Sequence, residues 1–152
     1  MDKTYVAVAV RIIMKERIIM SNKIIDFFKK DRFAAYNGIE LVEARPGYAV
    51  AKMKITENHL NGVDVLQGGA IFTLADLAFA AASNAQGQIT LSINANINFY
   101  KSTASKNIIA EAKEISATKK IVNYNVDVFD ENQELLARLN VSGYRKKDRI
   151  EF

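Results

Sequence analysis

The chain has 152 residues, enough for one domain with a single core, and its 49% hydrophobic and 25% charged residues are typical of a folded globular protein. It has no cysteine and only one histidine, His59, which excludes a disulfide framework, thiolate chemistry and a zinc site of several histidines, so we expect no metal. The net charge of +4 allows an anionic ligand, but without an RNP-like aromatic cluster or a helix-turn-helix pattern we expect no nucleic-acid partner.

Residues 1–20 are expected to form an N-terminal extension of the domain. The apolar run from Tyr5 to Val10 is short for the hydrophobic region of a signal peptide, and charged residues interrupt the sequence that follows. We therefore expect a cytoplasmic protein that does not associate with a membrane. The Val- and Ile-rich residues 5–19 predict an extra strand or an irregular arm, and Met20 could serve as a second translation start.

The next elements are expected to be a short helix and a hairpin. Ser21 or Asn22 can cap a helix over Lys23–Phe33, because their side-chain oxygens accept hydrogen bonds from the first amides of a helix. Two strands joined by a Pro-Gly turn are then predicted over Ile39–Ala44 and Tyr48–Ile55.

A helix that is apolar on every side is predicted over residues 67–84. Alanines fill the gaps between its large side chains, which are Ile71, Phe72, Leu74, Leu77 and Phe79. A surface helix shows one apolar stripe, so this helix is expected to be buried all round, and it is shorter than the ~20 apolar residues that span a membrane. Asp76 is its only ionisable residue, and a buried carboxylate is costly unless something compensates for its charge.

Long strands joined by short connections follow the helix. Apolar and polar residues alternate with period two, which predicts strands over Gln88–Tyr100, Asn107–Ala117, Ile121–Phe129 and Glu134–Tyr144. Short connections imply antiparallel pairing. We therefore expect an α+β fold, in which a curved antiparallel sheet wraps around one long buried helix. A C-terminal tail is expected over residues 146–152, with the basic run Arg145–Arg149 solvated.

The start of the apolar helix is a candidate site for polarising a carbonyl group. The first amides of a helix have no partner within it. Gly68 and Gly69 have no side chain, so a ligand oxygen can approach these amides closely. The simpler interpretation is that the two glycines only permit a tight turn. Asp76 follows Gly68 by eight residues, or ~12 Å along a helix, so one small reacting group cannot touch both within one chain. A carbonyl that meets both requires Asp76 of a second subunit, unless Asp76 is only a structural carboxylate.

Four motifs together resemble the PaaI-type thioesterases of the hotdog superfamily. They are His59-Leu-Asn61, Gln67-Gly-Gly69, Phe72-Thr-Leu-Ala-Asp76 and Ala78-Phe-Ala-Ala-Ala-Ser-Asn84. The match is dense over residues 59–84, and the predicted strands extend it to about residue 145. The resemblance implies a hotdog thioesterase domain over residues 21–145.

The resemblance also implies a reaction, which is hydrolysis of acyl-coenzyme A thioesters by a homodimer or homotetramer. Coenzyme A is part of the substrate, so no cofactor is expected. The thioester carbonyl would bind the amide of Gly68 or Gly69, and Asp76 of the partner subunit would be the nucleophile or the base that activates water. Asn61 would help to place the carbonyl or the water.

Further residues take their expected roles from the same resemblance. Ser92 would orient the water, with Thr90 and Asn94 as alternatives on the same expected face. Gln67, Gly69 and His59 would contribute to substrate binding, although the loop position of His59 favours bracing of the loop over catalysis as a base.

The chain departs from the family pattern where Gln67 replaces a usual histidine, and also at Asp64 and Ala85, which replace a frequent glycine and a serine. Gln67 can donate and accept hydrogen bonds but cannot change its charge near neutral pH. Two alternatives therefore stay open: a hotdog module that binds acyl-coenzyme A without hydrolysing it, and a structural oligomer in which Asp76 is only a paired interface carboxylate.

Overall fold

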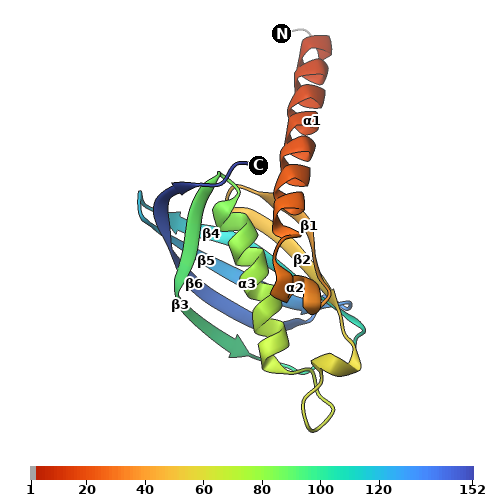
Figure 1. The fold of residues 1–152 in the computed structure, drawn as a ribbon. Coiled ribbons are helices and arrows are strands. Elements are labelled where there is room, and N and C mark those ends of the chain that lie inside the picture. The colour runs from red at the N-terminus through yellow and green to blue at the C-terminus, as the bar shows by residue number, and fades with distance from the viewer. Residues whose placement is uncertain (1–2) are drawn as a thin grey trace.

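The computed structural model describes residues 3–152, which form one antiparallel sheet with a long helix packed across one of its faces (Figure 1). The sheet has six strands in the order β1-β2-β4-β5-β6-β3. These strands are β1 (Ile39–Arg45), β2 (Tyr48–Lys54), β3 (Gln88–Phe99), β4 (Asn107–Ala117), β5 (Ile121–Asp130) and β6 (Leu135–Arg149). The helices are α1 (Lys3–Phe28), α2 (Arg32–Tyr36) and α3 (Gly68–Asn84), and a 3-10 turn spans Glu57–His59.

The core lies between α3 and the sheet. Small side chains on both sides allow a close approach, because Ala75 and Ala78 of α3 and Ala51 and Ala110 of the sheet are fully buried. The expected α+β architecture of an antiparallel sheet around one long helix is confirmed.

The prediction that α3 is buried all round is wrong for the single chain. One line of residues remains partly or fully exposed at helical spacing, namely Gly69, Phe72, Thr73, Asp76 and Ala80. We call this line the α3 stripe. The sheet, together with α1 and α2, covers the rest of the helix, so within the described residues the stripe is the face of α3 left for another contact.

Strand β3 lies beside α3 and is an edge of the sheet (Figure 1). It pairs with β6 on one side only, so the backbone groups on its other side have no strand partner within residues 3–152. Leu91, Ile93 and Phe99 of this strand are each more than half exposed. An unpaired edge with large apolar side chains is a surface suited to another chain. We call β3 and the α3 stripe together the open face.

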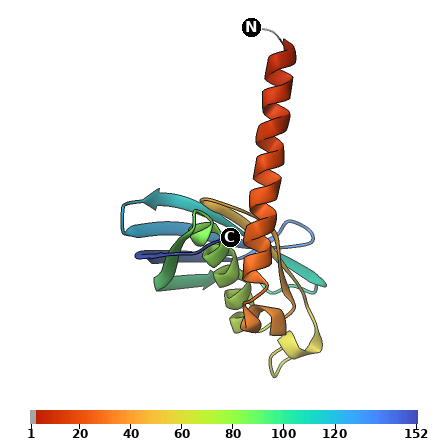
Figure 2. The same ribbon diagram turned by 45° about the horizontal axis from the view of Figure 1, so that its top comes forward.

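The N-terminal region differs from the predictions. Residues 5–19 form neither a strand nor an irregular arm but part of α1, which projects from the domain (Figure 2). The expected helix over Lys23–Phe33 is also wrong, because α1 runs to Phe28 and a separate helix, α2, follows it. Asp31 caps α2, accepting hydrogen bonds from the amides of Phe33 and Ala34.

The two ends of the chain join the domain more closely than expected. Ile24 of α1 is fully buried in the core, so the helix crosses the expected boundary near residue 20. Strand β6 continues through the basic residues to Arg149, which pairs with Gln88 of β3, and the start of the expected solvated tail is therefore part of the sheet. No helix in the described part of the chain is both long and apolar enough to cross a bilayer.

Candidate active site at the start of α3

Gln67 occupies one of the two candidate amides at the start of α3, because its side chain accepts the hydrogen bond of that N–H group. Its side-chain oxygen accepts a hydrogen bond from the amide of Gly69, and its carbonyl accepts one from the amide of Ala70 at 3.0 Å. The amide of Gly68 has no acceptor among the described residues. Of the two glycines that the sequence left open, Gly68 is therefore the one whose N–H can meet a ligand oxygen, assisted by the partial positive charge of the helix start.

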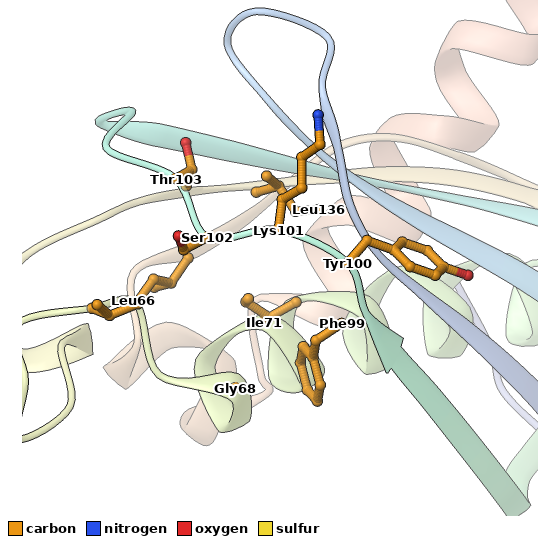
Figure 3. Close-up of a pocket in the computed structure, with 10 residues that line it drawn as sticks. Leu66, Gly68, Ile71, Phe99, Tyr100, Lys101, Ser102, Thr103 and Leu136 are labelled. Carbon is orange, nitrogen blue, oxygen red and sulfur yellow. The ribbon is translucent and has the colours of Figure 1, made fainter.

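A cavity of about 380 Å³ adjoins Gly68 (Figure 3). Ile71, Phe99 and Leu136 give it apolar walls, and the segment Tyr100–Thr103 adds three residues with hydroxyl groups and Lys101. The ring of Phe99 packs on the helix start so closely that a Cβ at Gly68 would lie 3.0 Å from its Cζ. The glycine thus allows an aromatic ring and a free amide to share one wall of the cavity.

Asp76 lies in the middle of the α3 stripe and is partly exposed. No group within residues 3–152 donates a hydrogen bond to its carboxylate. Burial raises the pKa of Asp76, because the ionised carboxylate loses hydration, and the negative charge of Asp31 raises it further. The spacing of eight residues keeps Asp76 ~12 Å from Gly68 along the helix, so one chain alone does not bring the two groups together.

Asn61 organises the loop before α3. Its side-chain oxygen accepts hydrogen bonds from the amides of Val63 (3.0 Å) and Val65 (3.1 Å), which leaves the side-chain NH₂ group without a partner among the described residues. Asp64 in this turn has a φ of 57°, in the left-handed region that favours glycine. That backbone conformation explains why glycine is frequent at the position that Asp64 occupies.

His59 braces the same loop. Its side chain is 6% exposed, and Nδ1 accepts a hydrogen bond from the amide of Thr56 at 3.0 Å. Nε2 lies 3.1 Å from the carbonyl of Asn37, which fixes it as the protonated donor. The His59 carbonyl accepts a hydrogen bond from the amide of Gln67, so the brace also sets the start of α3. Both ring nitrogens are engaged, as expected for a loop-bracing residue.

The three polar candidates on β3 occupy different environments. Thr90 is buried, and its amide donates a hydrogen bond to the side-chain oxygen of Asn84 at 2.7 Å, so its role is structural. A bulge separates Ser92 from Asn94: Ser92 pairs with Gly143, which contacts the ring of Phe79 on the helix side, whereas Asn94 pairs with Ser142. Directly opposed residues share a face of a sheet, so Ser92 lies on the side of α3 and Asn94 on the other side.

Similarity to known proteins identifies the family of this chain. Residues 64–137 match the model of the thioesterase superfamily. A relative from Archaeoglobus fulgidus, whose name places it among the esterases, is 35% identical over 119 residues, covering 78% of this chain and 77% of the relative. The chain belongs to the thioesterase superfamily. The acyl-coenzyme A thioesterase PaaI of Escherichia coli is 29% identical to this thioesterase over 119 residues, covering 78% of this chain and 85% of PaaI.

The solved structure of E. coli PaaI resembles this thioesterase with a TM-score of 0.80 at 27% identity, covering 87% of this chain and 99% of PaaI. The hotdog fold, the PaaI type and the thioester-hydrolase class predicted from the sequence are confirmed. The individual residue roles stay predictions.

Sequence reasoning missed two neighbours of the site in this thioesterase. Phe99 ends a strand far along the chain from Gly68, and alternation along a strand carries no signal for a contact with a helix start. Asp31 was not singled out, since its N-cap position explains it locally while its effect on Asp76 depends on how α2 packs against α3.

Proposed function

We propose that the protein hydrolyses acyl-coenzyme A thioesters at sites shared by two subunits. The observation that carries this proposal is that two groups of α3 have no hydrogen-bond partner among the described residues, the Gly68 amide at the start of the helix and the Asp76 carboxylate in the middle of the α3 stripe. The relation to PaaI, an acyl-coenzyme A thioesterase, supports the substrate class.

In the proposed reaction the substrate carbonyl oxygen accepts a hydrogen bond from Gly68. This bond stabilises the negative charge that develops on the oxygen as the carbonyl carbon becomes tetrahedral. Asp76 of the second subunit either attacks the carbon, giving a mixed anhydride that water then hydrolyses, or takes a proton from the attacking water. In both routes the C–S bond breaks, and the products are the free acid and coenzyme A thiol.

The assembly that fits this site is a two-fold homodimer joined through the open face, with a homotetramer as its further pairing. A second β3 would supply partners for the unpaired edge, and a second α3 would cover the stripe that carries Asp76. The side-chain NH₂ of Asn61 and the hydroxyl of Ser92 would then hold the carbonyl or the water. Gln67, Gly69 and His59 would keep the binding loop in place. We also propose a cytoplasmic location.

Subunit mixing tests the shared site. Asp76→Asn removes the acid, and Gly68→Pro removes the amide N–H at a position where proline suits a helix start. The preceding Gln67 already has the extended conformation that proline requires, with ψ of 134°. Each variant alone should release no thiol from acyl-coenzyme A above background. An equal mixture, dissociated and reassociated, should recover about a quarter of wild-type activity, since half of the dimers hold one complete site in two.

Gly68→Ala is the matched control, because it adds a Cβ beside Phe99 but keeps the N–H. It should retain much more activity than Gly68→Pro. Full activity of Asp76→Asn, or a reassociated mixture that stays inactive, would contradict the shared site.

A module that binds acyl-coenzyme A without hydrolysing it is the second candidate, and Gln67 in place of a titratable histidine is the observation that favours it. Saturable binding of acyl-coenzyme A by the wild-type protein with no thiol release would establish this alternative.

A further inference from the structure

One wall of the cavity beside Gly68 is held in place by a turn far along the chain. This wall, Tyr100–Thr103, belongs to the connection between β3 and β4, and the turn that contacts it joins β5 to β6 over residues 130–134. We propose that Asp130 of this turn is a positioning residue for the substrate, because it fixes Ser102 in the wall as a substrate contact. This inference rests on the proposed function and adds two residues to its site.

Asp130 joins the turn to the wall through its carboxylate. The residue is 6% exposed, and Oδ1 accepts hydrogen bonds from the amides of Asn132 at 2.9 Å and Glu134 at 3.1 Å. Oδ2 accepts a hydrogen bond from the hydroxyl of Thr103 at 3.0 Å. That hydroxyl in turn accepts a hydrogen bond from the amide of Ser105 at 3.1 Å. One carboxylate therefore closes its own turn and also binds the wall of the cavity.

The carboxylate of Asp130 is ionised near neutral pH, which keeps both of its oxygens as acceptors. Desolvation alone would raise the pKa of Asp130, but the hydrogen bonds from the Glu134 amide, the Thr103 hydroxyl and the Asn132 amide outweigh it and hold the pKa below its usual range. Hydrogen bonds to an ionised acceptor are stronger than those between neutral groups. The contact with Thr103 is therefore of the stronger kind.

Two further acidic residues of the turn contact the same connection, but both are exposed. Glu134 forms an ion pair with Lys101. Glu131 accepts a hydrogen bond from the amide of Lys106 at 3.0 Å, beyond the wall of the cavity. Water and salt screen exposed ion pairs, so the pair at Lys101 contributes little. Asp130, which is buried, is accordingly the main anchor of the wall.

The wall is fixed on both sides of Ser102. On the preceding side, the amide of Lys101 donates a hydrogen bond to the Leu136 carbonyl at 3.3 Å. On the following side, Thr103 is bound to Asp130. Ser102 is thus the one residue between two anchors, and the anchors set the position of its hydroxyl group.

The hydroxyl of Ser102 is open to a ligand. Ser102 lines the cavity, and its hydroxyl has no hydrogen-bond partner in the described part of the chain. Lys101 of the same wall pairs with Glu134, and the side chains of Tyr100 and Lys101 point away from Gly68 (Figure 3). A hydroxyl can donate a hydrogen bond to an amide carbonyl of a coenzyme A thioester or accept one from an amide N–H. Ser102 therefore binds the substrate close to the carbonyl that Gly68 polarises.

Thr103→Val tests the anchor and leaves the β5–β6 turn closed, because it removes the hydroxyl that Asp130 binds and keeps the branched shape of the side chain. KM for thiol release should rise about three- to tenfold, while kcat stays within about twofold, since a contact made equally in the ground and transition states is lost. The substrate is the best hydrolysed of acetyl-, hexanoyl- and benzoyl-coenzyme A. Thr103→Ser retains the hydroxyl and should recover most of the loss. Asp130→Ala should raise KM at least as much as Thr103→Val.

Ser102→Ala separates positioning from a purely structural role. It should raise KM by a similar factor of about three to ten, with kcat within about twofold. Adding Thr103→Val to Ser102→Ala should then have little further effect on KM, because the wall has no hydroxyl left to place. These two variants decide the question even if Asp130→Ala does not fold.

Thr118→Val is the matched control. The hydroxyl of Thr118 also closes a turn, accepting a hydrogen bond from the amide of Ile121 at 2.9 Å, but this turn joins β4 to β5 at the opposite end of these strands. Thr118→Val should leave KM and kcat unchanged.

Three results would overturn the positioning role of Asp130 and leave the proposed function standing. They are an unchanged KM in Ser102→Ala, an unchanged KM in Thr103→Val, and fully additive effects of these two substitutions. Absence of thiol release by the wild-type protein with all three substrates would overturn the proposed function and this inference with it.

Discussion

The ionised carboxylate of Asp76, which the proposed reaction requires, lowers the stability of the single subunit. Burial and the charge of Asp31 raise its pKa above the ordinary value, so the folded protein binds the proton more tightly than the unfolded chain does. The ionised form therefore lowers the free energy of unfolding at any pH above the folded pKa. This cost disappears as the pH falls below the pKa of the unfolded chain.

Asp76→Asn should therefore raise the free energy of unfolding at neutral pH, and the two proteins should converge as the solution is acidified. Urea denaturation at several pH values measures the difference. In the wild type, kcat/KM should fall on acidification at a pH above the ordinary aspartate value of 3.8, because the reaction requires the ionised carboxylate. A variant that is less stable than the wild type at neutral pH would show instead that the assembly supplies a hydrogen-bond donor to the carboxylate.

His59 should affect stability and not the chemical step. His59→Ala leaves the Thr56 amide and the Asn37 carbonyl without their buried partner, which should cost about 1–3 kcal/mol in the free energy of unfolding. Chemical denaturation gives this value, and kcat under folding conditions should fall far less than in Asp76→Asn. His59→Gln retains a donor and an acceptor and should recover part of the stability. A loss of kcat in His59→Ala as large as that in Asp76→Asn would argue for a catalytic histidine.

Most of the candidate site could be proposed from the sequence, because its residues fall in one dense block, and their roles stay predictions. Gly68, Asp76 and Asn61 stand in local motifs whose chemistry depends on residue type and spacing. Which glycine amide stays free could not be predicted, since it depends on the rotamer of the Gln67 side chain. That Ser92 and Asn94 lie on opposite faces could not be predicted, because strict alternation places both on one face and only the bulge in β3 separates them.

At the scale of elements, the strands were predicted to within a few residues and the N-terminal helix was not. The strands show period two, with one buried face and one polar face. Helix α1 is rich in Val and Ile, which favour strands, and its exposed residues show no single apolar stripe. The end of β6 was missed because its backbone pairs with β3 while its charged side chains stay in water.

The packing of α3 on the sheet gives a sharp prediction at Gly143 of β6. A Cβ there would lie 2.8 Å from Phe79 Cζ and 2.8 Å from Thr90 Cγ2, closer than packed atoms allow. Gly143→Ala should therefore lower the free energy of unfolding by about 1–3 kcal/mol, as measured by chemical denaturation. Gly62→Ala, whose Cβ meets nothing within 4 Å, is the control and should change it by less than about 0.5 kcal/mol. Equal changes in the free energy of unfolding for Gly143→Ala and Gly62→Ala would mean that the core relaxes around the methyl group added at Gly143.

At the scale of the whole molecule, the open face predicts that assembly and activity are lost together. Ile93 of β3 is 60% exposed in the single chain, and a glutamate there would place a charge inside the proposed contact. Ile93→Glu should therefore convert the oligomer to single subunits, as measured by light scattering, and abolish thiol release. Ile115 of β4 is 59% exposed but lies outside the open face, so Ile115→Glu should keep both properties. An active single-subunit Ile93→Glu protein would refute the shared site.

The packing of Phe152 also bears on how the protein can be handled. Phe152 packs edge-on against Phe27 at 5.5 Å between ring centroids, and the nearby Ile150 amide donates to the Gly87 carbonyl at 2.9 Å. A purification tag fused after Phe152 would therefore begin in a packed contact near the base of α1. One fused ahead of α1 would extend from the projecting end of that helix, well clear of the open face (Figure 2). An N-terminal fusion is accordingly the safer design for recombinant production.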